Sequence, residues 1–364
     1  MSDGPTGERH PGLLVVWSGA APTLQAFPIG AQGLVLGREL LGTTSDDRIS
    51  RQHARVAIRD SAGTDPGVIR FGVTDLASRN GTFVSGQLLV ERDISVTAPA
   101  VVRAGRTVAI VLDDLRRFRE ASVVMRGDTV VGPSTSQVWQ AVESAAAAST
   151  HLLITGEDGV GKSRLGEHYA QQRKVREARF DPTVHAVALE RVVGDAMTLI
   201  LEAPGKLTAA HHEALGRLLD QREALRVVTT ATQRLEALGM PAALAARLSA
   251  RVVEVPPLRS RPEELSYLVA EAVKSAAPAL SIHSSLIEVS LLRPWPGNVR
   301  ELSAAVVRAA HEVAAAGKNN LRGEDLDTEA GYLMAGAPTI NASVQPTMLG
   351  ARRRRRSVSK ADEN

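Results

Sequence analysis

One eight-residue segment constrains this chain more than any other: residues 156–163 read Gly-Glu-Asp-Gly-Val-Gly-Lys-Ser. The spacing is G-x-x-x-x-G-K-S, and its glycines let backbone N–H groups turn toward the oxygen atoms of a phosphate. A helix that begins at the end of the segment would add the positive end of its dipole. The segment therefore predicts a nucleotide site made by Gly156, Gly159, Val160, Gly161, Lys162 and Ser163.

Two side chains of this segment have distinct expected roles. Lys162 would reach the outer phosphates, and the hydroxyl of Ser163 would bind Mg²⁺. An apolar run at residues 152–155 precedes the segment and a helix-like stretch at 164–174 follows it, which is the context that the motif requires. The alternative is a relic loop that has kept the pattern and binds nothing.

Length and composition limit the other choices. With 364 residues the chain is expected to hold two or three domains, and 44% hydrophobic residues suffice for their cores. The absence of cysteine excludes disulfides, thiolate metal sites and a cysteine nucleophile. Residues 1–12 are polar, and no apolar run approaches the roughly 18 residues of a membrane span. We therefore expect a soluble, cytoplasmic protein that does not contact membranes.

The N-terminal third reads as short strands separated by turns. Runs of β-branched and aliphatic residues alternate with clusters of Gly, Asp, Ser and Asn, and no helical pattern intervenes. The clearest runs are residues 13–17, 33–36, 54–58, 68–71 and 108–112. Regular short strands of this kind predict an all-β sandwich.

Three polar signatures lie in the turns of this region. Gly37-Arg38 ends one strand, Ser50-Arg51-Gln52-His53 precedes another, and residues 78–82 read Ser-Arg-Asn-Gly-Thr. In this order and spacing they resemble the forkhead-associated (FHA) domain, a β-sandwich that reads phosphothreonine. Loops of a sandwich gather at its ends, so these residues are expected to converge.

The expected phosphothreonine-binding residues are Arg38, Ser50, Arg51, Arg79 and Asn80. The two arginines at positions 38 and 51 offer guanidinium donors to a phosphate dianion, and the serine offers a hydroxyl. The resemblance implies that Asn80 bonds the peptide backbone beside the phosphothreonine. Many family members carry a small hydroxyl residue at position 79, so Arg79 either adds a phosphate contact or points to solvent. The alternative is that Arg38 and Arg51 are ordinary solvated arginines.

The resemblance also gives His53 a role, which is to brace the loop without contacting the ligand. A lone histidine in a small β domain is structural more often than it is a ligand. Both arguments therefore predict the same structural position for His53.

The middle of the chain alternates between strand-like and helix-like runs. The strand-like runs are residues 152–155, 184–189, 198–201, 227–230 and 252–255. This alternation predicts a parallel sheet covered by helices, with the nucleotide at the carboxyl ends of the strands.

Two further strings are diagnostic. Residues 256–265 read Pro-Pro-Leu-Arg-Ser-Arg-Pro-Glu-Glu-Leu, and residues 295–302 read Trp-Pro-Gly-Asn-Val-Arg-Glu-Leu. Together with the phosphate-binding loop they resemble the AAA+ domain of sigma-54-dependent transcription activators. The predicted fold is multidomain: an all-β FHA sandwich, an α/β AAA+ P-loop domain with a helical lid, and a disordered basic tail.

The expected boundaries follow from these assignments. The FHA domain would span 12–116, a charged linker 117–129, the α/β subdomain 130–258, the lid 259–326 and the tail 327–364. Helical spacing of Leu, Val and Ala predicts lid helices at 262–276 and 302–315.

The AAA+ resemblance implies roles for several residues. Val131 and Gly132 fall where the family's contact with adenine begins, and Arg300 falls on the lid arginine that senses the γ-phosphate. Arg247 falls on one of the two finger arginines that act on a neighbouring subunit, whereas the other finger position is Pro241. Losing a finger arginine should slow phosphoryl transfer severely.

The metal-binding strand also departs from the family pattern. Residues 198–205 align with a Thr-Leu-Phe-Leu-Asp-Glu-Ile-Gly motif, so Glu202 replaces the metal-binding aspartate beside Ser163. Ala203 replaces the residue that activates water, and alanine cannot accept a proton. A polar sensor that is usually asparagine falls on Thr232.

A third departure concerns the target of the activators. Gly161 and Glu202 are separated by 40 residues, whereas the family carries a long insertion there with a Gly-Ala-Phe-Thr-Gly-Ala loop that grips sigma-54. No such string occurs in this sequence. We therefore do not expect this chain to remodel the sigma-54 polymerase.

These departures predict a module that binds ATP and Mg²⁺ and hydrolyses little ATP. The competing interpretation is an active ATPase in which Asp158 or Glu190 supplies the missing carboxylate. A slip in the alignment at Glu202 and Ala203 is a further alternative, although residues 199–201 are the only apolar run there with the required flanks.

The last part of the chain is compositionally different. We find no helix-turn-helix pattern after residue 326, and residues 335–350 contain Pro, Ser and Thr and read as disordered. Five arginines, Arg352 through Arg356, supply more than the whole net charge of +3, so the remainder is slightly acidic and lacks a broad basic face. Such a run binds nucleic acid weakly and without sequence preference, binds an acidic partner, or is simply solvated.

Phosphorylation offers two further ideas about the tail. Ser357 and Ser359 follow the arginine run and could accept phosphate from a basophilic kinase, and Thr339 and Thr347 could be FHA ligands in cis.

Three functional hypotheses result. The favoured one is a regulator of signalling and transcription that docks a phosphothreonine-containing protein, either a kinase or its substrate, beside a nucleotide-binding scaffold. The resemblance to ring-forming AAA+ proteins implies a homo-oligomer. The alternatives are a phosphorylation-gated ATPase that regulates transcription and a direct DNA-binding regulator that uses the arginine run.

Overall fold

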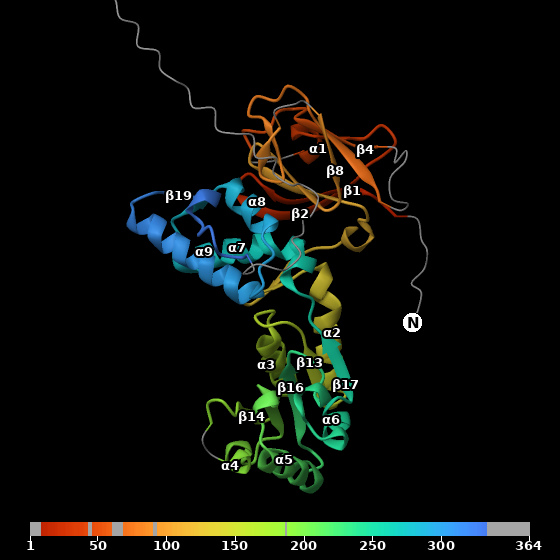
Figure 1. The fold of residues 1–364 in the computed structure, drawn as a ribbon, viewed down its shortest axis with the longest axis vertical. Coiled ribbons are helices and arrows are strands. Elements are labelled where there is room, and N and C mark those ends of the chain that lie inside the picture. Colours follow the sequence, from red (N-terminus) through yellow and green to blue (C-terminus); the bar gives the residue numbers. More distant parts are fainter. Residues whose placement is uncertain (1–8, 43–45, 60–67, 90–92, 186–187, 333–364) are drawn as a thin grey trace, which may run out of the picture.

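The computed structural model describes residues 9–42, 46–59, 68–89, 93–185 and 188–332. In Figure 1 a β-sandwich lies at one end, a parallel sheet with its helices lies at the other, and a small group of helices lies against the sandwich. The tail was predicted at 327–364, but residues 327–332 are described and hydrogen-bond to the lid: Arg293 donates to the carbonyls of Asp327 and Ala330, and the N–H of Gly331 donates to Glu301. The rest of the predicted tail, with Arg352 to Arg356 and the phosphorylatable residues, lies outside the described residues.

The sandwich consists of two antiparallel sheets, as the sequence predicted. One sheet has the strand order β2-β1-β10-β9-β6-β7 and the other has the order β3-β4-β5-β8. A single helical turn, α1 (Arg38–Leu41), follows the third strand. The strands are β1 (Gly12–Ser18), β2 (Ala21–Pro28), β3 (Leu34–Leu36), β4 (Ala54–Arg59), β5 (Arg70–Asp75), β6 (Thr82–Val84), β7 (Gln87–Leu88), β8 (Asp93–Thr97), β9 (Ala100–Ala104) and β10 (Thr107–Leu112).

Strand β1 is buried on both faces. Leu13 and Val15 point into the core between the two sheets, whereas Leu14 and Val16 belong to a second core on the outer side. A strand of an antiparallel sandwich usually alternates between apolar and polar side chains because one face meets water. The continuous apolar run of β1 therefore indicates that another element covers the outer face.

The covering element is the helical lid. It contains α7 (Pro262–Ala276), α8 (Ser284–Leu292) and α9 (Asn298–Ala315), together with the short strands β18 (Ser281–Ile282) and β19 (Asn320–Leu321). One hydrophobic core contains Leu14 and Val16 of β1 and the lid residues Leu265 and Leu286. Figure 1 shows α7 and α8 directly beneath the sandwich.

A buried ion pair joins the same two parts. The guanidinium of Arg103 on β9 lies 2.5 Å from the carboxylate of Glu288 on α8, and both side chains are largely inaccessible to water. Arg103 also stacks over the ring of Phe83, with 3.7 Å between the guanidinium carbon and the ring centroid. The sandwich and the lid are therefore packed as one unit.

The α/β subdomain has the predicted parallel sheet. Its strands are β13 (Leu152–Thr155), β14 (Glu177–Phe180), β15 (Thr198–Leu201), β16 (Arg226–Ala231) and β17 (Arg251–Glu254), in the order β14-β15-β16-β13-β17. All neighbouring pairs are parallel. The accompanying helices are α2 (Pro133–Ala147), α3 (Lys162–Arg173), α4 (Leu189–Val193), α5 (Ala209–Gln221) and α6 (Ala242–Leu248).

The strand predicted at residues 184–189 is wrong. Val184 lies in a turn with 76% of its surface exposed, Leu189 begins α4, and residues 186–187 lie outside the described part. The strand at this edge of the sheet is β14, in which Phe180 alone is fully buried. An edge strand needs little apolar surface, so β14 lacks the hydrophobic run that marks central strands.

Between the sandwich and the α/β subdomain the chain is ordered. A 3₁₀ turn at Arg116–Phe118 is followed by a hairpin of β11 (Val124–Arg126) and β12 (Thr129–Val131). Phe118 is buried in the core that the sandwich shares with the lid. Among the described residues, no helix is both long enough and apolar enough to cross a membrane.

Candidate functional sites

The phosphate-binding loop joins β13 to α3, and its backbone shows why glycine is needed. Gly159 has φ +75° and Gly161 has φ +106°, in the region that residues with a Cβ rarely adopt. A Cβ at Gly159 would also overlap the carbonyl oxygen of Gly297 in the lid. The loop therefore keeps the conformation of a phosphate cradle and lies in contact with the lid.

Lys162 lies across the mouth of this loop. Its ammonium donates hydrogen bonds to the carbonyl oxygens of Gly156 and Glu157, both at 2.8 Å, and lies 3.7 Å from the carboxylate of Asp158. Burial lowers the pKa of Lys162, Asp158 opposes this effect, and the charge of Arg300 lowers the pKa further. The Lys162 ammonium thus lies beside the loop, and an anion bound there would replace these oxygen atoms as its partner.

Ser163 and Glu202 meet at the end of the loop. The Ser163 hydroxyl donates to the Glu202 carboxylate at 2.6 Å, which brings the two predicted metal ligands together. Ala203 follows with φ +47° and lines the same cleft as Thr232. Among the described residues, no group of three or more His, Cys, Asp or Glu is arranged to hold a metal without other ligands.

A cleft of about 1040 Å³ extends from this loop toward the lid. Arg300 of α9 lines it, and its backbone N–H donates to the carbonyl of Gly159 at 3.3 Å. Val131 and Gly132 do not line it. The wall near them is formed instead by Thr129, Val130, Thr135, Val138 and Trp139.

A buried carboxylate of the lid contacts Gly132 in place of a ligand. Glu264 of α7 accepts a hydrogen bond from the backbone N–H of Gly132 at 2.8 Å and another from the hydroxyl of Thr135. Burial raises the pKa of Glu264, and the adjacent Arg261 opposes this effect. Arg261 also donates to the carbonyl of Val160 at 2.8 Å, so one lid cluster holds both the loop and the start of α2.

A second lid contact fixes the loop from the other side. Arg259 forms a two-pronged ion pair with Glu157, and this interaction lowers the pKa of Glu157. The side-chain amide of Asn298 donates to the carbonyl of Asp158 at 2.9 Å and to Glu157 at 3.1 Å. Contacts with the lid therefore set the position of the phosphate-binding loop.

The carboxylates are distributed unevenly around the cleft. Asp158 lines it, whereas Glu190 pairs with Arg217 at 3.2 Å and is not among the lining residues. Asp181 also lines it, directly after β14. The sequence did not point to Asp181 because the strand was predicted at residues 184–189, after its true position. Since ligands bind at the carboxyl ends of parallel strands, a correct strand boundary would have identified Asp181.

The finger position lies apart from the cleft. Arg247 on α6 donates to the carboxylate of Asp220 and to the carbonyl of Leu219, both at 2.6 Å. Pro241 caps the N-terminus of the same helix. Neither residue lines the cleft of its own chain.

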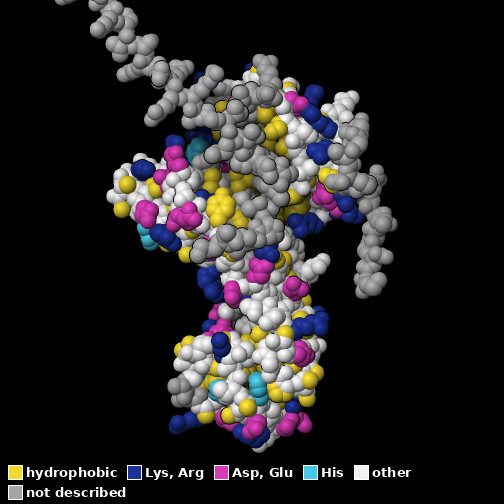
Figure 2. Space-filling model, in the orientation of Figure 1, with side chains coloured by type: hydrophobic (Ala, Val, Ile, Leu, Met, Phe, Trp, Pro, Cys, Tyr) yellow, Lys and Arg dark blue, Asp and Glu magenta, His cyan; other side chains and the backbone are white. Residues whose placement is uncertain are grey.

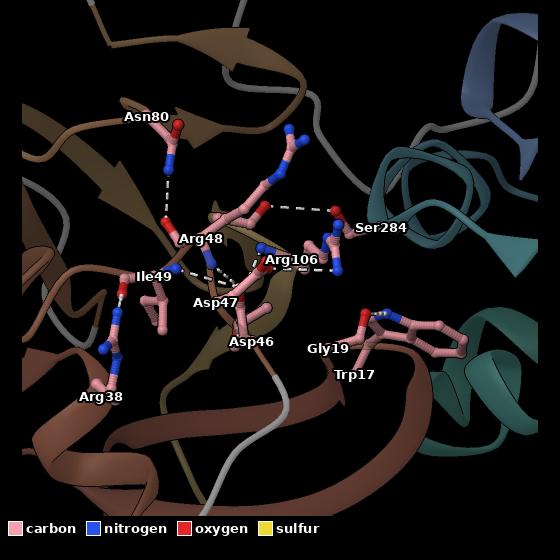
Figure 3. A network of polar contacts seen from close by, with 12 residues as sticks. Trp17, Gly19, Arg38, Asp46, Asp47, Arg48, Ile49, Asn80, Arg106 and Ser284 are labelled. Atoms are coloured by element: carbon pink, nitrogen blue, oxygen red, sulfur yellow. Dashed lines mark hydrogen bonds and ion pairs between the residues drawn. The ribbon is translucent and has the colours of Figure 1, made fainter.

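The second candidate site is formed by the loops of the sandwich. Figure 3 shows Arg38 beside Ile49, and Asn80 beside Arg48. The Arg38 guanidinium donates to the Ile49 carbonyl at 2.9 Å, and the Asn80 amide donates to the Arg48 carbonyl at 2.6 Å. Residues from three separate turns therefore converge on one loop.

The same loop carries Ser50. Its hydroxyl accepts a hydrogen bond from the backbone N–H of Arg79 at 3.3 Å. The side chains of Arg51 and Arg79 are exposed and make no hydrogen bond or ion pair with the described part of the chain. Two exposed arginines without partners thus lie in sequence or in contact beside one hydroxyl, which together make a donor set for a phosphate dianion.

His53 braces this loop, in agreement with its expected role. It is fully buried, its Nδ1 accepts from the backbone N–H of Ser50 at 3.1 Å, and its Nε2 lies 3.0 Å from the carbonyl of Gly81. Asp46 accepts from the backbone N–H groups of Arg48 and Ile49 at 2.9 and 3.1 Å. Buried groups therefore fix the conformation of the loop, and the exposed side chains of Arg51 and Arg79 stay available to a ligand.

Comparisons with known proteins agree with this architecture. Residues 34–110 match the family model described as "FHA domain". The "Nif-specific regulatory protein" of Herbaspirillum seropedicae is 29% identical over 57% of this chain and 48% of its own length. "Regulatory protein LuxO" of Vibrio cholerae is 28% identical over 46% of this chain and 41% of its own length.

Structural comparison gives the same fold. The crystal structure of NtrX from Brucella abortus superposes with a TM-score of 0.50 at 21% identity, covering 57% of this chain and 58% of that one. The chain spans about half the length of the curated relatives that it matches. Residues 34–110 thus match an FHA domain, and the parallel sheet with its helices and lid has the fold of NtrX and is similar in sequence to bacterial regulatory proteins.

Proposed function

We propose that this protein is a phosphothreonine-dependent regulator in which the FHA domain docks a phosphorylated partner and the AAA+ module binds ATP with little hydrolysis. The observation that carries the proposal is the convergence of Arg38, Ser50, Arg51, Arg79 and Asn80 around one braced loop. Arginine donors and a hydroxyl suit a phosphate dianion better than a carboxylate, because they supply more hydrogen bonds than a carboxylate accepts from one side.

The phosphopeptide would use donors that are now turned inward. Arg38 donates to a backbone carbonyl at the edge of the site, and an incoming phosphate would compete for that guanidinium. Arg51 and Arg79 would contact the remaining oxygens. Asn80, whose amide now holds the Arg48 carbonyl, would bond the peptide backbone beside the phosphothreonine.

The nucleotide proposal rests on the cleft and its donors. The glycine loop, Lys162 and Arg300 would hold the phosphates of ATP, and the base would lie against Thr129 and Val130. Ser163 and Glu202 would share Mg²⁺, whose remaining ligands would be phosphate oxygens and water. Mg²⁺ would neutralise phosphate charge.

Little hydrolysis is expected because Ala203 cannot orient or deprotonate a water molecule. It occupies the cleft wall directly after Glu202, where an activating side chain would be needed. Nucleotide would then act by holding the lid and the α/β subdomain together, through contacts that both make with the loop.

A role in transcription is supported by the relatives, whose names describe regulatory proteins. The sequence lacks the sigma-54-gripping loop, so the proposed regulator acts on another target. In a homo-oligomer Arg247 would contact the nucleotide site of the neighbouring subunit, since it does not line the cleft of its own chain. Figure 2 shows both charge signs intermixed on the visible face of the α/β subdomain, without a continuous basic surface for nucleic acid.

Phosphothreonine docking can be tested by fluorescence polarisation with phosphorylated and unphosphorylated forms of a threonine peptide library. We expect binding only to the phosphorylated forms, and a loss of at least about 10-fold in Arg38→Ala, since a charge-assisted contact is removed. Arg55→Ala is the matched control, because Arg55 is exposed on strand β4. Equal binding of unphosphorylated peptides would refute the docking function.

Nucleotide binding and turnover should be measured on the same sample of full-length protein. We expect ATP to bind with Mg²⁺, Lys162→Ala to abolish binding, and the lid variant Lys274→Ala to leave it unchanged, because Lys274 lies on an exposed face. Steady turnover of several ATP per second that depends on Lys162 would contradict the low-hydrolysis proposal.

The second candidate function, an active ATPase, is favoured by one observation. Asp181 lines the cleft together with Glu202 and Ala203, and its carboxylate accepts hydrogen bonds from Thr183 at 2.6 and 2.8 Å. If turnover is found, Asp181→Asn separates the two functions. Loss of turnover with retained ATP binding would identify Asp181 as the base and support the enzyme.

A further inference from the structure

The loop of the FHA domain that carries Arg48, Ile49 and Ser50 is in contact with the lid through Gly105. The backbone of Arg48 and Ile49 packs against Gly105, where a Cβ would lie only 2.7 Å from their backbone atoms. The carbonyl of Gly105 in turn accepts a hydrogen bond from the hydroxyl of Ser284, the first residue of α8, at 3.4 Å. Figure 3 shows Arg48, Arg106 and Ser284 close to one another at this junction.

The next residue extends the contact to a second part of the lid. The hydroxyl of Ser285 accepts from the backbone N–H of Gly323 at 3.1 Å, and Gly323 packs against the backbone of Ser285. Arg322 precedes Gly323 and is exposed. Two arginines more than 200 positions apart, Arg48 and Arg322, are therefore brought to the two sides of the start of α8.

Four arginines lie near the start of α8. His283, the N-cap of α8, has a pKa lowered first by burial and then by the positive charges of Arg103, Arg322, Arg48 and Arg106. Four arginines from the sandwich and the lid thus surround one point. Any of these guanidinium groups that has no carboxylate partner is suited to bind an anion beside the phosphate site.

The nearby carboxylates are already used. Glu288 pairs with Arg103 at 2.5 Å, and Asp47 pairs with Arg106 at 3.3 Å. Asp46 is buried and accepts from backbone N–H groups and from Thr107. Asp325 accepts from the backbone N–H of Arg322 and from Lys318.

The side chains of Arg48 and Arg322 make no hydrogen bond or ion pair within the described residues. Both are exposed beside the loop that carries Ser50. They are therefore the two guanidinium groups of this junction that remain available to an external anion.

We propose that the phosphothreonine ligand carries additional negative charge next to its phosphothreonine, and that Arg48 of the FHA domain and Arg322 of the lid bind this charge together. The inference rests on the proposed phosphothreonine docking. It makes the recognition surface composite, because an isolated FHA domain would lack half of it. A surface that selects acidic flanks also disfavours the chain's own arginine-rich segment as the ligand, because its arginines would be repelled by Arg48 and Arg322.

The test uses full-length protein and four peptides of one sequence: a phosphothreonine peptide with neutral flanks, one with aspartates on both flanks, one with a flanking second phosphate, and the unphosphorylated acidic peptide. We expect the second and third to bind about 10-fold more tightly than the first, and the fourth to bind negligibly. The larger gain of the two shows whether carboxylates or a second phosphate are preferred.

The variants identify the residues responsible. Arg48→Ala and Arg322→Glu should each remove most of the gain and leave the affinity for the neutral-flanked peptide unchanged. The matched control is Arg234→Glu, at an exposed arginine of the α/β subdomain. Because Arg322 is exposed without a side-chain partner, thermal melting should show that its replacement leaves the fold intact.

Failure of the inference differs from failure of the docking function. A gain that survives in the Arg48→Ala, Arg322→Ala double variant, or no gain in the wild type, overturns the composite surface while loss of all binding in Arg38→Ala still supports docking. If Arg38→Ala binds every peptide normally, the docking function itself is refuted, and the composite surface with it.

Discussion

At the scale of single residues, the glycine at position 105 links the loop that carries Arg48, Ile49 and Ser50 to the lid. Gly105 has φ +60°, and a Cβ there would meet the backbone of Arg48 and Ile49 at 2.7 Å. Gly127 has almost the same φ, +62°, but nothing lies within 4 Å of its Cβ position. Substitutions at Gly127 and Gly105 therefore distinguish the cost of backbone strain alone from the cost of strain with steric overlap.

We expect Gly127→Ala to lose about 1–2 kcal/mol of unfolding free energy, the usual cost of a left-handed residue with a Cβ. Gly105→Ala should lose more, and it should also weaken phosphopeptide binding because the loop must shift. Chemical denaturation and polarisation assays measure the two effects. Equal losses in both variants, with unchanged peptide affinity, would show that the loop does not depend on this close approach.

At the scale of elements, the central strand β13 begins beside a histidine that is kept neutral. His151 accepts a hydrogen bond from the backbone N–H of Val227 on β16 at 3.1 Å. Burial lowers the pKa of His151 to about 4, and the charges of Arg226, Arg247 and Arg173 add to this effect. The hydrogen bond from Val227 is therefore made only by the neutral imidazole, whose Nδ1 can accept.

The consequence is a stability that falls in mild acid. An unfolded chain protonates this histidine near pH 6.5, whereas the folded chain does so only near pH 4, so the unfolded state binds more protons between these values. The contribution is complete above pH 6.5 and is lost as the pH falls toward 4. We expect the α/β subdomain to lose ~2 kcal/mol over this window after allowance for partial exposure.

Urea denaturation at several pH values, monitored by hydrogen exchange in β13 and β16, measures this loss. His151→Asn keeps a hydrogen-bond acceptor but does not titrate, so its stability should change less over the same window. An identical pH dependence in both proteins would assign the effect to other groups.

At the scale of the whole molecule, the sandwich and the lid share one hydrophobic core, whereas the α/β subdomain has two cores of its own. Because Arg103 and Glu288 form a buried ion pair across the shared interface, removing one partner leaves an uncompensated charge. Glu288→Ala should therefore destabilise this unit by about 3–5 kcal/mol. Glu288→Gln should lose less, since it retains a hydrogen-bond acceptor.

Hydrogen exchange resolved by segment tests this coupling. In Glu288→Ala, protection should fall together in β9, β10 and α8, while β15 and β16 of the α/β subdomain keep theirs. If exchange increases in α8 alone, the sandwich and the lid are independent units, and a composite peptide surface would not be maintained.

The sequence by itself determined those features that depend on short stretches of backbone. The glycines of 156–163 specify a phosphate cradle wherever a strand precedes and a helix follows, and the apolar runs of β13, β15 and β16 mark a parallel sheet. The three turn signatures identified the FHA sandwich, because each turn requires particular side chains in a fixed order. Strand β14 and helix α8 were missed, since an edge strand and a helix buried on nearly all sides lack the usual periodicity.

Tertiary structure alone decided how the parts meet. No local pattern places Glu264 against Gly132, or Arg48 and Arg322 beside the same helix. These positions result from packing between residues that are distant in sequence, above all the burial of the outer face of β1 against the lid. Burial depends on the whole set of contacts. The phosphate-binding loop could therefore be predicted from the sequence, whereas its contacts with the lid could not.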